Sequence, residues 1–265
     1  MKRISLAILL FLLGCQTDGE KTNLKEPKVP TAIFVDLRDG NEYKIIQIGD
    51  QIWFAENLRY ASENSYCYKN KEENCKKFGR LYTNNPNCTN IKGSNQYGNP
   101  LSFMCTQREM RHVISDSLFH TCPKGWHIPS TEDWDTLFQT VGNHNIAGKK
   151  LKSSKGWRFG NNGNDDFDFN VIPVPGGELH YGKISFDDNS EKGTNTCFWS
   201  QSKNIFQEGV ERLICFNLSD SIKINIPWYG GNDPTVGHNY FMFPIRCIIT
   251  NPVEEQKQPN KKKSK

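Results

Sequence analysis

The chain has 265 residues, of which 36% are hydrophobic, and its 33 Lys and Arg against 29 Asp and Glu give a formal net charge of +4. The surplus lies at the two ends, because residues 29–250 hold 23 basic and 24 acidic residues, a net charge of −1. Domains that bind nucleic acid carry a basic face. The composition therefore argues against a nucleic-acid partner.

The N-terminus has the pattern of an export signal. A basic start at residues 1–3 is followed by the apolar run ISLAILLFLL, which is too short to span a bilayer as a stable helix, so residues 1–14 are expected to be a signal peptide. The ending LLGC is similar to the lipobox of bacterial lipoproteins, in which the cysteine, here Cys15, receives the lipid. Gln16 rather than Asp after that cysteine favours the outer membrane of the cell envelope.

Polar segments flank the central part of the chain. Residues 15–32 are almost free of apolar side chains and contain two prolines, which predicts a flexible, lipidated tether. Residues 251–265 form a similar basic tail, expected to be disordered. The part between them, residues 33–250, has no internal linker and is expected to fold as one domain.

The apolar pattern of this domain predicts several short strands. A meander is expected at the start, with strands at 33–37, 42–48 and 51–54 separated by turns containing Gly40 and Gly49. Later apolar runs, expected to be strands, lie at 197–200, 211–218, 222–226 and 240–249. Frequent Gly, Asn and Asp residues indicate many loops. The expected class is α+β, with antiparallel sheets and few helices.

The segment TCPKGWHIPSTEDW, residues 121–134, leads into the one helix that the pattern strongly supports. Ser130 is a suitable N-cap, and acidic residues follow it in the first turn, where they oppose the positive end of the helix dipole. Apolar side chains recur at helical spacing at Trp134, Leu137, Phe138 and Val141. The same segment offers Cys122 and His127 as a nucleophile and its base, but their spacing gives no reason for them to meet. A structural role is therefore favoured.

Cysteine usage indicates an oxidising compartment. Once Cys15 is assigned to lipidation, eight cysteines remain, an even number that predicts four disulfides in an exported chain. Zinc is the alternative, but the chain has no Cys-x-x-Cys pair and no pair of histidines at ligand spacing. The residues alone leave about 105 pairings open.

Two segments are candidates for binding. The run NNGNDDFDFN concentrates oxygen ligands suited to calcium at Asn164, Asp165, Asp166 and Asp168. It lacks EF-hand spacing, and a solvated turn with Asx hydrogen bonds is the favoured explanation. A second, Gly-rich segment, residues 228–240, carries Trp228, Tyr229 and Tyr240, which are candidates for surface recognition. Core packing is expected instead for three other tryptophans, Trp126, Trp134 and Trp199.

Six motifs, in this order, carry a resemblance to a known family: YCYKNKEENCKKFGRLYT, CPKGWHIPSTEDWDTL, AGKKLKSSKGW, DDFDFNVIPVPGG, CFWSQS and FPIRC. The chain resembles the Fibrobacter succinogenes major paralogous domain family of exported bacterial proteins, which has no established activity. More distantly it is similar to C-type-lectin-like and formylglycine-generating-enzyme-like folds. That resemblance implies the disulfides Cys122–Cys247 and Cys67–Cys75, which leaves Cys88–Cys105 and Cys197–Cys215 as the remaining pairs.

The chain lacks the sugar-binding motifs of calcium-dependent lectins and a catalytic cysteine pair, so neither activity is implied. The resemblance and the loop aromatics together favour a lipid-anchored, non-enzymatic, lectin-like module for a glycan or a surface protein. Calcium is the one cofactor considered. An exported enzyme, either a hydrolase or a thiol-dependent modifier, and a passive scaffold are the alternatives.

Overall fold

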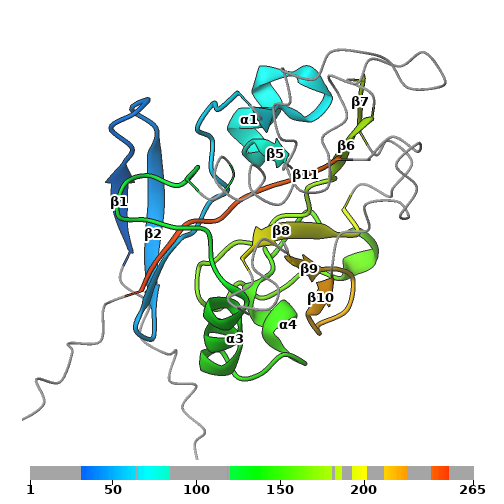
Figure 1. Ribbon diagram of the computed structural model, residues 1–265. Helices are drawn as coiled ribbons and strands as arrows, with labels where there is room; N and C mark the ends of the chain where they lie inside the picture. Colours follow the sequence, from blue (N-terminus) through cyan, green and yellow to red (C-terminus); the bar gives the residue numbers. More distant parts are fainter. Residues whose placement is uncertain are drawn as a thin grey trace, which may run out of the picture.

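The computed structural model describes residues 31–63, 65–83, 118, 120–180, 183–186, 193–201, 212–225 and 240–250. Three antiparallel sheets and a few short helices make up this part of the chain (Figure 1), which confirms the expected α+β, loop-rich class. Within these residues no helix is long and apolar enough to cross a membrane. The signal peptide, residues 15–30 of the expected tether and the C-terminal tail lie outside them, as do Cys15, Cys88, Cys105, Trp228 and Tyr229. Residues 31 and 32 were expected to belong to the tether but are the first two residues of a strand.

The first sheet brings together the two ends of the described chain. Its strand order is β1-β2-β3-β12, with bounds Thr31–Val35, Glu42–Ile48, Gln51–Phe54 and Ile248–Thr250. Thr31 pairs with Ile46, Ile46 with Trp53, and Trp53 with Ile248, so the start of β1 and the final strand β12 share one row. The predicted ranges of β2 and β3 are confirmed.

The prediction for β1 was shifted by two residues. The strand ends at Val35 instead of residue 37 because Asp36 begins the turn to β2. Its carboxylate accepts hydrogen bonds from the backbone N–H of Arg38 (3.1 Å) and from the Arg38 guanidinium, whose Nη2 lies 2.7 Å away. Burial alone would raise the pKa of Asp36, but these bonds and the arginine charge lower it overall.

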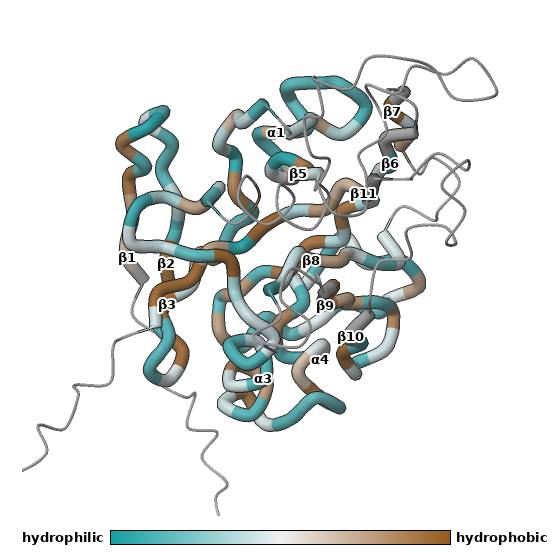
Figure 2. The backbone as a smooth tube through the Cα atoms, viewed as in Figure 1, coloured by the Kyte–Doolittle hydropathy of each residue, from teal (hydrophilic) through white to brown (hydrophobic). Residues whose placement is uncertain are grey.

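The second sheet and the predicted helix enclose the main aromatic core. The sheet has the order β10-β9-β8, with bounds Lys223–Asn225, Arg212–Phe216 and Thr196–Ser200. Helix α3, Thr131–Thr140, packs its Trp134 between this sheet and the first one, 4.8 Å from the ring of Trp53 and 5.7 Å from that of Phe198. Figure 2 shows the hydrophobic segments running through the middle of the molecule. The predicted core positions of Trp126, Trp134 and Trp199 are confirmed by their burial.

The start of α3 agrees with the prediction in detail. Ser130 caps the helix by accepting from the backbone N–H of Asp133 at 3.1 Å, and the Asp133 carboxylate in turn accepts from the backbone N–H of Ser130 at 2.8 Å. This reciprocal pair is a capping box. The carboxylate of Asp133 is thus engaged in starting the helix.

The third sheet lies at the end of the domain away from β1 and β2 (Figure 1). Its order is β4-β5-β11-β6-β7, with bounds Ser65–Tyr66, Leu81–Thr83, Tyr240–Phe243, Gly177–His180 and Lys183–Phe186. The apolar run predicted as a strand at 240–249 is divided at Pro244, which has no N–H to donate, so its two halves join different sheets. The strands β4, β5, β6 and β7 of this sheet were not predicted. Four short helical elements were also not predicted: α1 (Glu72–Phe78), α4 (Ala147–Leu151) and the 3-10 turns Tyr68–Asn70 and Arg158–Gly160.

Three disulfides join the described cysteines: Cys67–Cys75, Cys122–Cys247 and Cys197–Cys215. Cys67–Cys75 and Cys122–Cys247 are the pairs that the family resemblance implies, and Cys197–Cys215 is one of the two pairs that it left. Cys197 and Cys215 are direct partners in the ladder of β8 and β9. Cys122–Cys247 closes 125 residues and fixes the segment before α3 to the segment before β12, a closure worth about 5 kcal/mol on the loop-entropy model.

Arg246 has a fully buried side chain that connects several segments in the centre of the domain. Its guanidinium donates to Asn57 Oδ1 (3.0 Å) and to the carbonyl oxygens of Asn170 (2.9 Å) and Phe169, and it lies over the Phe169 ring. Burial lowers the pKa of Arg246 to about 9, so the group remains charged at neutral pH. One side chain thereby joins the segments that follow β3 and precede β6 to the segment between β11 and β12.

Candidate functional site

A cleft of about 360 Å³ lies on one face of the third sheet, and its floor is set by strand register. Phe241 of β11 pairs with Glu178 of β6, and Glu178 pairs with Ser185 of β7. Direct partners on neighbouring strands point to the same face. Phe243, two residues along β11, joins them, with its ring 6.1 Å from that of Phe241 and nearly parallel to it. The volume falls within the range of small-molecule sites.

The walls come from two other segments. Val174 and Gly176 border one side, and Asn195 and Cys197, at the start of β8, border another. Space is tight at Gly177: a Cβ there would lie 2.6 Å from Met242 Cε and 3.1 Å from the Ser185 carbonyl oxygen, so a larger residue would force the Met242 side chain to move. The Gly-Gly ending of the segment PVPGG thus lets β6 approach β11 closely enough to form the cleft.

The described lining combines stacked rings with a few hydrogen-bonding groups. Glu178 and Asn195 provide a carboxylate and an amide beside Phe241 and Phe243. Such a surface can pack against an apolar or sugar-ring face and bind its polar groups. Glu178 is the one carboxylate of this described lining, whereas glycoside hydrolysis ordinarily uses two.

The predicted aromatic segment leads into this cleft. Tyr240 is the first residue of β11, directly before Phe241, while Trp228 and Tyr229 lie outside the described residues. Sequence reasoning did not single out Glu178, Ser185 or Asn195. The alternation of Phe241 and Phe243 in the run YFMF was the available signal that one face of this strand is aromatic.

The predicted calcium segment is held by other interactions. Asp165 Oδ1 accepts from the backbone N–H of Asn170 at 2.7 Å, and Asp168 Oδ2 lies 3.5 Å from Lys44 Nζ. Burial raises the pKa of Asp165. Asp165, Asp168 and Asn170 all adopt positive φ near 55°, as tight Asx-rich turns allow.

The carboxylates of this segment do not converge. Asp165, Asp166 and Asp168 form no group of three His, Cys, Asp or Glu residues with ligand atoms within 4.8 Å of one another, and Asn164 and Asp166 are exposed. The geometry therefore gives the calcium site no support from a preformed carboxylate cluster. Calcium binding at these residues stays a prediction.

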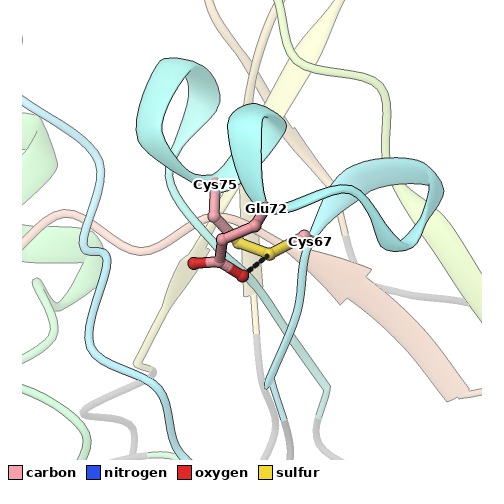
Figure 3. A group of neighbouring side chains, drawn as sticks. All are labelled: Cys67, Glu72 and Cys75. Atoms are coloured by element: carbon pink, nitrogen blue, oxygen red, sulfur yellow. Dashed lines mark hydrogen bonds between the residues drawn. A yellow bond between two sulfur atoms is a disulfide. The ribbon is translucent and has the colours of Figure 1, made fainter.

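Cys67, Glu72 and Cys75 are the group among the described residues that does meet this criterion (Figure 3). The two cysteines are joined in a disulfide and so offer no thiolate to a metal. Glu72 Oε2 lies 3.2 Å from Cys67 Sγ, but a disulfide sulfur has no proton, so this is a polar contact and not a hydrogen bond. Arg80 Nη1, 3.9 Å from the same oxygen, balances the carboxylate charge. The group is structural.

The nucleophile and base considered at the start of α3 do not form a catalytic pair. Cys122 is bonded to Cys247, so it is not a free thiol. His127 Nε2 lies 3.4 Å from Asp133 Oδ2, and the Ser130 hydroxyl donates to that same oxygen at 2.7 Å. The carboxylate therefore stands between the serine and the histidine, whereas a serine nucleophile needs the histidine between the other two.

Comparison with known proteins gives one match. The sequence profile of the Fibrobacter succinogenes major domain matches residues 46–248, a range that includes every strand from β3 to β11. No curated protein and no solved structure matches the chain. The likeness to C-type lectins accordingly stays a prediction. The extent of the profile match shows that the chain belongs to the Fibrobacter succinogenes major domain family.

Proposed function

We propose that this protein is a lipid-anchored protein of the bacterial outer membrane whose domain is a non-enzymatic, lectin-like module that binds a glycan in the cleft on β6, β7 and β11. The observation that carries the proposal is the row Phe241–Glu178–Ser185, which sets a ring, a carboxylate and a hydroxyl side by side on one open sheet face. Sugar rings have apolar faces and polar edges, and this row offers complementary groups to both.

The arrangement of the domain supports an anchored binding role. The first described strand and the last share the sheet at one end of the molecule, which is where a tether at Cys15 would join it. The strands of the cleft lie at the opposite end (Figure 1). A cleft so placed would face away from the membrane, toward material outside the cell or across the envelope. A surface protein is the alternative ligand.

The test is binding of the full-length protein in detergent to a broad glycan array, with calcium and then with chelator. We expect binding of at least one glycan, and a loss of about tenfold or more in Glu178→Gln, since an unmatched buried polar contact typically costs 1–3 kcal/mol. Glu132→Gln on the exposed face of α3 is the matched control and should bind normally.

Three results would count against the proposal or change it. A complete absence of glycan binding by the folded protein would remove the glycan ligand and direct the search to protein partners. Equal binding by Glu178→Gln and Glu132→Gln would show that the glycan does not bind in the cleft. Loss of binding with chelator would make the module metal-dependent and return attention to Asp165 and Asp168.

A further inference from the structure

A second hollow, here called the α1 groove, borders the same extended segment that walls the cleft. It consists of two neighbouring parts, of about 520 Å³ and 290 Å³, and Lys77, Phe78 and Ile172 line both. The larger part is mainly apolar, and Pro173 and Pro175 border it, whereas Val174 between them borders the cleft. Alternate residues of one segment therefore line the two hollows.

The described lining of the α1 groove is strongly cationic. Positively charged side chains reach it from four separate places in the chain: Arg59, Lys76, Lys77, Lys155 and Arg246. Glu56 is the one acidic residue among them, and it is paired with Arg59. Like charges gathered in a concave, partly buried surface create a positive potential that attracts anions.

Arg246 contributes a positive charge to this potential, and no described carboxylate pairs with it directly. Its hydrogen bonds go to carbonyl and amide oxygens, which satisfy its donors without neutralising its charge. No described carboxylate lies within 4 Å of its guanidinium, and the group is fully buried at the wall of the groove. A fixed positive charge in a low-dielectric surround acts more strongly on a bound anion than an exposed lysine does.

Helix stability explains only part of this cluster. Lys76 and Lys77 occupy the last turn of α1, where positive charge opposes the negative end of the helix dipole. Arg59, Lys155 and Arg246 belong to other segments, so no helix accounts for them. Their convergence on one groove is the observation that needs an explanation.

The apolar walls favour a sugar over a peptide as the anionic ligand. Extended peptides bind by adding hydrogen bonds to an open strand, and prolines at 173 and 175 have no N–H to offer there. Flat apolar surfaces from Phe78 and Pro173 instead suit the carbon face of a ring. We propose that the α1 groove binds an acidic saccharide, with its negative group at Arg59, Lys76 and Lys77 and a sugar ring against Phe78. This inference rests on the proposed glycan-binding function.

The experiment measures binding of the full-length protein in detergent to polygalacturonate, with fully methyl-esterified polygalacturonate as the neutral probe. The double variant Lys76→Ala, Lys77→Ala is compared with Lys124→Ala, Lys223→Ala, which removes the same charge from exposed sites outside the groove. We expect the protein to prefer the acidic polymer, the groove variant to weaken that binding about fivefold or more, and the control to leave it unchanged. Polyglutamate should bind more weakly than polygalacturonate.

Several outcomes would overturn the inference. Equal loss in the two double variants would mean that net charge alone attracts the polymer. Polyglutamate binding as tightly as polygalacturonate would assign the groove to acidic peptides. A third outcome is that the protein binds neutral glycans as well as acidic ones and that Glu178→Gln abolishes this binding. That result would rule out the α1 groove as an acidic-saccharide site and would still support the cleft. No binding of any glycan would end both proposals together.

Discussion

The two ends of the domain use their side chains in different ways. Around β3 and α3, large rings and charged groups have partners within the domain: Trp53 packs on Trp134, and Arg246 donates hydrogen bonds to four oxygens. Around β6, β7 and β11, one sheet face leaves a ring, a carboxylate and a hydroxyl open in a cleft. The first end should therefore govern stability and the second should govern binding, and variants can test this separation.

The largest expected loss of stability comes from removing the buried side chain of Arg246. Replacing Arg246 with alanine leaves a cavity and leaves the buried oxygens of Asn57 and Phe169 without this hydrogen-bond donor. We therefore expect the free energy of unfolding to fall by about 3–5 kcal/mol. Urea unfolding followed by tryptophan fluorescence measures it. The control is Arg158→Ala on an exposed turn, expected within about 0.5 kcal/mol of the wild type. Similar values for the two variants would show that the buried arginine does not hold the core.

A smaller effect is expected at the start of α3. Ser130→Ala removes the side chain that caps the helix, and we expect a loss of about 1–2 kcal/mol in the same urea experiment. Thr136→Ala is the matched control, because it removes an exposed hydroxyl from the middle of the same helix. The capping account fails if both variants lose the same amount.

The smallest expected effect is a change in how stability depends on pH in acid. The pKa of Asp36 is lowered in the folded state by Arg38, so its stabilising contribution is present above the unfolded aspartate value of about 3.9 and is lost as pH falls through the folded value. Urea midpoints measured from pH 6 down to pH 2 should therefore fall less steeply in Asp36→Asn than in the wild type. Asp166→Asn, at an exposed position, should follow the wild-type curve. An Asp36→Asn curve parallel to the wild type would contradict the role of this pair.

Local patterns in the sequence were sufficient for much of the stable end. The alternation in residues 42–54 and the turn at Gly49 define β2 and β3, and Ser130 followed by helically spaced rings defines α3. Each of these signals lies within a dozen residues of the element it specifies. Local physical chemistry, namely side-chain periodicity and capping, is enough to find them.

The candidate site depends on information that is not local. Phe241, Glu178 and Ser185 meet only because three strands pair in a particular register, and nothing near Glu178 in the sequence distinguishes it. Helix α1 escaped notice for a related reason. It has seven residues, and its N-cap, Lys71, makes no side-chain cap, so its position is set by the Cys67–Cys75 disulfide and by packing.

The strands β1 and β12 are the two edges of one four-stranded sheet, so the two ends of the described domain lie close together. Thr31 and Ile248 stand in the same row, three strand spacings or about 14 Å apart. A linker of about six residues spans that gap. A circular permutant joined there and opened at Gly40, in the exposed turn between β1 and β2, should keep every strand pairing while moving both chain ends to the other end of that sheet.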